Sequence, residues 1–248
     1  LWGVYYCSDG FAQQSGLRDE PVSTEALLNV TEKFIGLCNE YGEQVQRDEE
    51  GLFTLDRREV FAVSAGLYEN VSRVLPLSDE PAVRCKGVSR PLSYLMSATG
   101  FTGFSCPYTG ESNVNTHMPD LMLPSTIAHE LAHQRGVERE DYANFTAVIA
   151  SLESGRADYA YSGAVMGYIY LGNALYSADY ETWHTLYASI SPAVRADLNA
   201  HNAYWQQFDG KTEEVSEQLY EQLLESVGDE RGMASYGACV DLLVEWYG

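Results

Sequence analysis

Residues 126–145, with the sequence TIAHELAHQRGVEREDYANF, contain two of the chain's five histidines, four positions apart. Four residues are close to one helical turn, so a helix here presents His129 and His133 on the same face. The apolar residues around the pair are Leu121, Met122, Leu123, Ile127, Leu131 and Ala132. Such a helix is amphipathic and half buried, so the segment requires a fold in which one packed helix holds two imidazoles rigidly.

The pair fits the pattern H-E-x-x-H, in which two imidazoles can share one tetrahedral zinc ion. Glu130 then points beside the metal, a position that suits a general base for a water molecule that the metal acidifies. With five histidines in 248 residues, the three fixed positions arise by chance in about one chain in a hundred. The alternative is a polar helix whose histidines are exposed or hydrogen-bonded in the core.

A catalytic zinc site needs a third protein ligand and one open coordination position. Gly136 can end the helix in a left-handed turn, after which the chain enters a new helix near Arg139. This reversal can bring Glu140, in the first turn of the new helix, back to the metal. Asp141 is the competing ligand. Asn144, one helical turn after Glu140, can hydrogen-bond a liganding imidazole or can be an ordinary polar residue.

The rest of the chain indicates a mainly α fold. We expect helices at 23–46 and 56–75, a loop at 76–91, and a β-hairpin at 100–115, directly before the motif. Further helices are expected at about 125–135, 139–155, 157–177, 179–188, 191–207, 212–227 and 234–247. We therefore predict one domain over residues 1–248, mainly helical, with a small hairpin or sheet beside the helix that carries the motif.

The net charge of the chain indicates which classes of partner it can bind. The chain has 36 acidic and 15 basic residues, a formal charge of −21. Such a field repels phosphate groups, so nucleic acid is not expected as a partner, whereas metal ions and basic peptides are attracted. No apolar run reaches 18 residues, and the chain starts at Leu1 rather than Met. We therefore expect any membrane anchor to lie upstream of this sequence.

The cysteines argue against a thiolate metal site, because no C-x-x-C pair occurs. We expect buried free thiols, which leaves the redox compartment open. The five cysteines are Cys7, Cys38, Cys85, Cys106 and Cys239.

Two other functions fit parts of the sequence. Glu130 and His133 are also half of a di-iron carboxylate site, and a second Glu-x-x-His occurs at Glu181 and His184. The helix that carries the motif is short for such a site, and His129 would have no role in it. A zinc-binding sensor that holds a peptide without cutting it is the other possibility, although a base beside the metal would be of no use to it.

The segment HELAHQRGVEREDYANF resembles the H-E-x-x-H…E-x-x-x-D arrangement of glutamate-zincin peptidases. With PYTGESNVN before it and SYGACVDLLVEWY at the end, the chain resembles the bacterial family DUF3810, a domain of unknown function, from LWGVYY to the last helix. The resemblance implies a zincin-like peptidase domain on the extracytoplasmic side of a bacterial membrane. The chain departs from the family pattern at Tyr142, where a glutamate is expected, but Glu140 and Asn144 stay in register.

The resemblance also implies one zinc ion per chain and a peptide or protein as substrate. It places the metal on His129, His133 and Glu140 and makes Glu130 the base. We therefore expect a zinc-dependent peptidase.

The group that stabilises the oxyanion cannot be identified from spacing. Tyr236 and His201 are candidates, and each can equally be a structural residue. The hairpin before the motif can align an extended peptide as an added strand, or it can be an ordinary packed hairpin.

Overall fold

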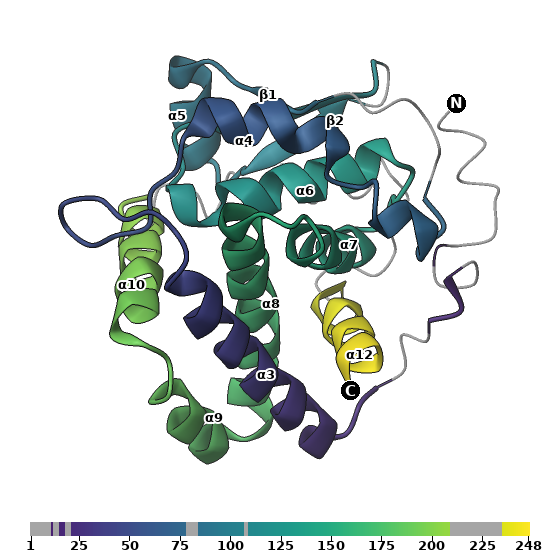
Figure 1. The fold of residues 1–248 in the computed structure, drawn as a ribbon, viewed down its shortest axis with the longest axis vertical. Coiled ribbons are helices and arrows are strands. Elements are labelled where there is room, and N and C mark those ends of the chain that lie inside the picture. The colour runs from purple at the N-terminus through teal and green to yellow at the C-terminus, as the bar shows by residue number, and fades with distance from the viewer. Residues whose placement is uncertain (1–10, 12–14, 18–20, 78–83, 107–108, 209–234) are drawn as a thin grey trace.

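A long central helix, α8 (Ala157–Ala178), organises the structure, a computed structural model that describes residues 11, 15–17, 21–77, 84–106, 109–208 and 235–248. This helix is apolar on all sides, and a helix of that kind is stable only when others surround it. The described part of the chain is mainly helical, as predicted (Figure 1). None of its helices combines the length and the hydropathy that a membrane span needs.

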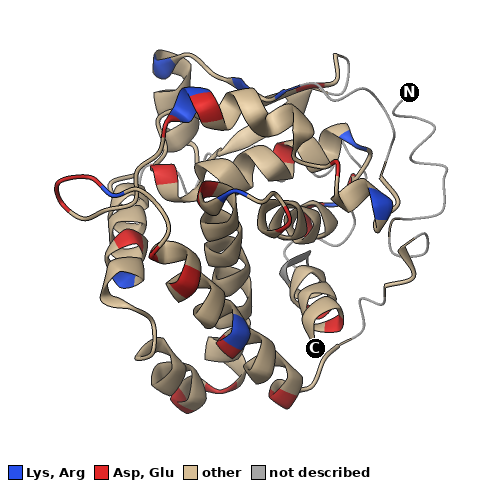
Figure 2. Ribbon diagram, in the orientation of Figure 1, with Lys and Arg blue, Asp and Glu red and all other residues tan. Residues whose placement is uncertain are grey.

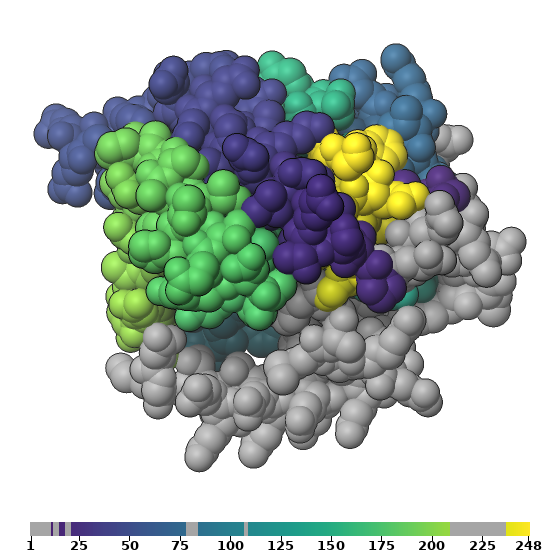
Figure 3. All heavy atoms as spheres, turned by 90° about the horizontal axis from the view of Figure 1, so that it is seen from below, coloured from purple at the N-terminus to yellow at the C-terminus, as the bar shows by residue number. Residues whose placement is uncertain are grey.

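Among the helices that pack on α8 are α3 (Thr24–Gly42), α7 (Glu140–Leu152) and α12 (Ser235–Tyr247). Seen from below, α12 lies against α3 (Figure 3). The side chains between these helices belong to one continuous apolar core, in which Phe34 of α3 is fully buried. Burial of this surface is the main source of stability, because each large apolar side chain contributes about 1.5–3 kcal/mol.

The helix with the motif, α6 (Leu123–Gln134), lies against a small sheet and follows a 3-10 turn, η3 (Asp120–Met122). The sheet has the order β1-β3-β2, with β2 and β3 antiparallel and β1 parallel to β3. β2 is therefore an edge strand. The hairpin predicted beside the motif is confirmed, whereas β1 falls in a predicted loop. The strands are β1 (Lys86–Gly87), β2 (Gly103–Cys106) and β3 (Glu111–Val114).

The single helix predicted at 56–75 is wrong. Tyr68 is fully buried, and its hydroxyl donates a hydrogen bond to the carbonyl of Ala128 (2.6 Å). This tertiary contact outweighs local helix propensity and directs the chain out of a continuous helix. The segment instead forms α4 (Arg57–Val63) and two 3-10 turns, η1 (Ser64–Gly66) and η2 (Val71–Arg73).

A helix that the sequence did not predict, α5 (Arg90–Ala98), follows β1. Its leucines, Leu92 and Leu95, are exposed, while Ser93 and Ser97 are buried and hydrogen-bonded. The hydrophobic pattern of this helix is thus reversed relative to its burial. A search for an apolar face turned inward cannot find such a helix.

The helices predicted at 179–188, 191–207 and 234–247 are confirmed. They are α9 (Tyr180–Tyr187), α10 (Pro192–Gln206) and α12. The helix predicted at 212–227 lies outside the described residues.

The expected buried free thiols are confirmed for three cysteines, Cys38, Cys85 and Cys239, which lie in the core. Cys106 is partly exposed. Cys7 lies outside the described residues.

A buried ionic network ties α10 to the segment after α3. Asp197, only 3% exposed, accepts hydrogen bonds from Arg47 Nη1 at 3.0 and 3.2 Å and from the amide of Phe53 at 2.8 Å. The hydroxyl of Tyr161 on α8 also donates to it. The carboxylate is therefore fully paired, and its removal would leave several buried donors without a partner.

We expect Asp197→Ala to lower the free energy of unfolding by about 3–5 kcal/mol, because it leaves the Arg47 charge uncompensated. Glu59→Ala is the matched control. It removes a salt bridge between Glu59 and Arg156 (2.8 Å) that is largely exposed, and it should cost no more than about 1 kcal/mol. Urea unfolding of the two variants measures the difference, and equal losses would contradict the assignment.

Candidate metal centre

The end of α6 is a left-handed turn, as the sequence predicted. Gly136 has φ 89°, a conformation that glycine adopts without steric cost. The amide of Gly136 donates to the carbonyl of His133 (3.0 Å), and that of Val137 donates to the carbonyl of Ala132 (3.1 Å). These bonds satisfy carbonyls at the helix end and reverse the chain, so that α7 begins at Glu140.

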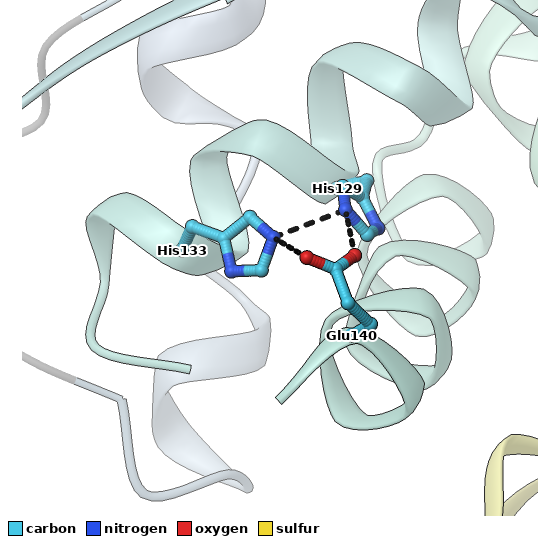
Figure 4. A group of neighbouring side chains, drawn as sticks. All are labelled: His129, His133 and Glu140. Atoms are coloured by element: carbon cyan, nitrogen blue, oxygen red, sulfur yellow. Dashed lines mark hydrogen bonds and ion pairs between the residues drawn. The ribbon is translucent and has the colours of Figure 1, made fainter. Parts of the chain in front are cut away.

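The reversal brings three side chains together from two helices. Figure 4 shows the imidazoles of His129 and His133 on α6 and the carboxylate of Glu140 on α7 pointing toward one another. The two imidazole Nε2 atoms lie 3.1 Å apart. Glu140 Oε2 is 3.1 Å from His129 Nε2, and Glu140 Oε1 is 3.3 Å from His133 Nε2. Within the described ranges, these three form a cluster that could hold a metal ion.

The spacing of these atoms can be tested against a zinc ion. Nitrogen and oxygen ligands held at about 2.0–2.2 Å in a tetrahedron lie about 3.3–3.5 Å from one another. The separations of 3.1–3.3 Å in the cluster are close to that value. The side chains of His129 and His133 are 14% and 10% exposed, whereas that of Glu140 is 48% exposed. The cluster thus opens to solvent on its carboxylate side, and the spacing and donor types of its three residues fit a zinc ion.

His133 is oriented by the turn itself. Its Nδ1 lies 2.7 Å from the carbonyl of Val137. A carbonyl can only accept, so Nδ1 carries the hydrogen, and in a neutral ring Nε2 keeps the lone pair that a metal needs. Gly136 reverses the chain, and the next residue, Val137, supplies the carbonyl that orients the imidazole of His133.

Of the two alternatives for Asn144, the structure favours an ordinary polar residue. In the described part of the chain, no hydrogen bond joins it to either imidazole, and His133 uses the main chain instead. The Nδ1 atom of His129 is buried and has no partner among these residues.

Asp141, the competing ligand, is engaged elsewhere. It is 1% exposed and forms a salt bridge with Arg139, whose Nε donates to Oδ1 at 3.0 Å. Its Oδ1 also accepts from the amide of Tyr142 (2.9 Å). The carboxylate that joins the histidines is that of Glu140.

Glu130 lies between α6 and the sheet and is 4% exposed. Its Oε2 accepts a hydrogen bond from the hydroxyl of Ser105 on β2 (3.0 Å). Burial raises the pKa of Glu130, although the two neighbouring histidines and Ser105 oppose the shift. A raised pKa suits a group that takes up a proton and releases it again.

Of the two oxyanion candidates, His201 has a described side chain, and this side chain does not join the cluster. His201 lies on α10, which packs on η3 at the start of α6. Its Nε2 accepts from Trp205 Nε1 (3.1 Å), and burial lowers its pKa to about 4. Tyr236 belongs to the first turn of α12, but its side chain lies outside the described residues.

The two halves of the proposed di-iron site are not assembled. Glu181 and His184 lie on α9, which packs against α8. α9 is at the end of α8 remote from α6 (Figure 1). The ring of His184 contacts the ring of Tyr180 (6.0 Å between centroids). A di-iron centre needs both pairs on one pair of metals, so this alternative is not supported.

Sequence reasoning missed the residues that support the site. Ser105 and Ser112 lie opposite each other on β2 and β3, and both hydroxyls reach Glu130. The alternation of small and larger residues in GFSC and ESNV was the available signal, because one face of such a hairpin can approach a helix closely.

The fold and the cluster define a class: a mainly helical protein with an H-E-x-x-H helix and a glutamate from the next helix turned toward it. The chain belongs to the DUF3810 family, described as a protein of unknown function, whose model matches residues 1–244. The comparisons with curated proteins and with solved structures gave no match.

We expect Gly136→Ala to lower the free energy of unfolding by about 1–2 kcal/mol, because alanine is strained at positive φ. It should also weaken zinc binding about tenfold, since the turn places Val137 and Glu140. Gly155→Ala is the control: Gly155 has φ 70° and open surroundings, in the turn between α7 and α8. It should cost similar stability and leave zinc affinity unchanged. Equal zinc affinity in both variants would contradict this role of the turn.

A pH dependence follows for the metal-free protein. Burial alone would lower the pKa of His133, but the hydrogen bond to Glu140 and the charges of Glu140 and Glu130 raise it from 6.5 to about 9. The protonated imidazole therefore stabilises the fold fully below pH 6.5, and this contribution is lost as the pH rises through about 9. In EDTA, the melting temperature should fall across this window more for the wild type than for Glu140→Gln. Parallel curves would contradict the pairing.

Proposed function

We propose that this protein is a zinc-dependent peptidase of the zincin type. The observation that carries the proposal is the convergence of His129 Nε2, His133 Nε2 and the Glu140 carboxylate within 3.1–3.3 Å. The Glu130 carboxyl is close enough to interact electrostatically with both histidines. Zinc held by these three residues would polarise the carbonyl of a peptide bond and acidify a water molecule.

Each residue of the chain has a defined part in the proposed reaction. The imidazoles and the Glu140 carboxylate hold the metal, and the carboxylate offsets part of its charge. Glu130 takes the proton of the attacking water and passes it to the leaving amine. Burial raises the pKa of Glu130 toward the neutral range, which suits a group that must bind the proton and then release it.

The edge strand β2 offers a means of aligning the substrate. In the described sheet, β2 has β3 on one side and no strand on the other. An extended peptide can pair with such an edge through main-chain hydrogen bonds. β2 also contacts α6, so a peptide bound there would lie close to the helix that carries the base.

The charge of the protein favours basic peptides. Acidic residues outnumber basic ones 36 to 15. Figure 2 shows acidic residues on elements at both ends of the molecule. We also propose an extracytoplasmic location on a bacterial membrane, with any anchor upstream of this sequence. That proposal is supported by the family resemblance.

Metal analysis and peptide digestion test the function together. The wild type should bind about one zinc per chain and cleave members of an unbiased peptide library. Glu130→Gln should retain zinc but lose cleavage about 100-fold or more, because the base is removed while the ligands remain. His129→Ala should lose zinc as well.

Glu181→Gln is the matched control. It removes a carboxylate that only a di-iron site would need, so cleavage and zinc content should be unchanged. Zinc retention without cleavage by the wild type would contradict the peptidase and indicate a sensor. Two irons per chain would contradict both the peptidase and the zinc-binding sensor.

A further inference from the structure

We infer that strand β2 fixes the orientation of the Glu130 carboxylate, with Ser105 as the positioning residue and Gly103 as the residue that leaves it room. The inference rests on the proposed function, because it assigns a role to the groups around the base. It concerns contacts that no sequence motif indicated.

The first observation is that two serine hydroxyls lie around Glu130. The hydroxyl of Ser105 lies 3.0 Å from Glu130 Oε2 and 2.9 Å from the Glu130 carbonyl. The hydroxyl of Ser112 lies 2.7 Å from the same carbonyl and 3.1 Å from that of Ser105. Each serine has one hydrogen to donate. Ser112 reaches only the carbonyl of Glu130, whereas Ser105 also reaches the carboxylate, whose charged oxygen is the stronger acceptor.

The second observation is the close approach of the carboxylate to the β2 backbone. A Cβ atom on Gly103 would lie 2.5 Å from Glu130 Oε1 and 2.8 Å from its Cγ. Any side chain at this position would displace the carboxylate. One carboxylate oxygen is thus hydrogen-bonded to Ser105, and the other packs against Gly103. With Glu130 only 4% exposed, little space remains for another rotamer.

Strand geometry explains why both contacts come from β2. Gly103 and Ser105 are two residues apart, so they face the same side of the sheet, toward α6. Phe104 faces the opposite side and is 46% exposed. A glycine and a serine on the inner face let the strand lie directly on the base. The edge strand proposed to align the peptide therefore also holds the group that acts on it.

This arrangement matters because a catalytic group must be held within a fraction of an ångström of its working position. A hydrogen bond to a charged oxygen is stronger than one between neutral groups, so Ser105 can restrain the carboxylate. Ser177 on α8 is a suitable control, because its exposed hydroxyl bonds the carbonyl of Asn173 in the same helix.

The experiment measures kcat and KM for the best-cleaved peptide of the library. Ser105→Ala should lower kcat about tenfold, with KM and zinc content unchanged. Ser105→Thr keeps the hydroxyl and should restore most of kcat. Ser177→Ala, which removes an exposed hydroxyl that bonds the carbonyl of Asn173, should leave kcat within about twofold of the wild type.

Gly103→Ala should lower kcat at least as much as Ser105→Ala, because it pushes the carboxylate away. Its control is Gly36→Ala, on an exposed and open part of α3, which should leave kcat unchanged. An unchanged kcat in Ser105→Ala, with an active wild type, would overturn the inference and leave the proposed function standing.

A second measurement does not require activity. In metal-free protein, Ser105→Ala should lower the melting temperature by about 2–4 °C, and by much less when Glu130 is already alanine. Additive effects of the two substitutions would overturn the inference whether or not peptides are cleaved. A non-additive result together with no cleavage by the wild type would support the contact and contradict the proposed function.

Discussion

The left-handed turn at Gly136 is the constraint on which the site depends. A chain that continued as helix would carry Glu140 away from the two histidines along the same axis. α6 ends at Gln134, two residues before Gly136, and α7 begins at Glu140, four residues after it. Two helices can therefore supply one cluster. The same turn provides the carbonyl that orients His133. One short segment thus sets both the reversal of the chain and the orientation of the His133 imidazole.

The parts of the site that are local in sequence could be predicted from it. A four-residue step on a helix fixes the common face of His129 and His133, and a glycine followed by a polar turn predicts the reversal to Glu140. These inferences need no knowledge of the rest of the fold. The secondary structure was equally clear where an apolar face pointed inward, as in α3 and α8.

The parts that depend on distant contacts could not be predicted. Tyr68 leaves the helical pattern because its hydroxyl finds a carbonyl on α6. The serines of β2 and β3 acquire their partner only when the sheet packs on Glu130. In α5 the polar residues face the interior because their hydroxyls find partners there. In each of these places a tertiary contact competes with the local pattern, and the contact prevails.

The buried thiols have a consequence for metal selection. Thiolate is a stronger zinc ligand than imidazole or carboxylate, and a reactive cysteine near the cluster could capture the ion. Burial raises the pKa values of Cys38, Cys85 and Cys239, so these sulfurs stay protonated and out of reach. For these three cysteines, neither an oxidising nor a reducing medium then alters the covalent connectivity of the core, and none of the three competes with nitrogen and oxygen donors for an ion.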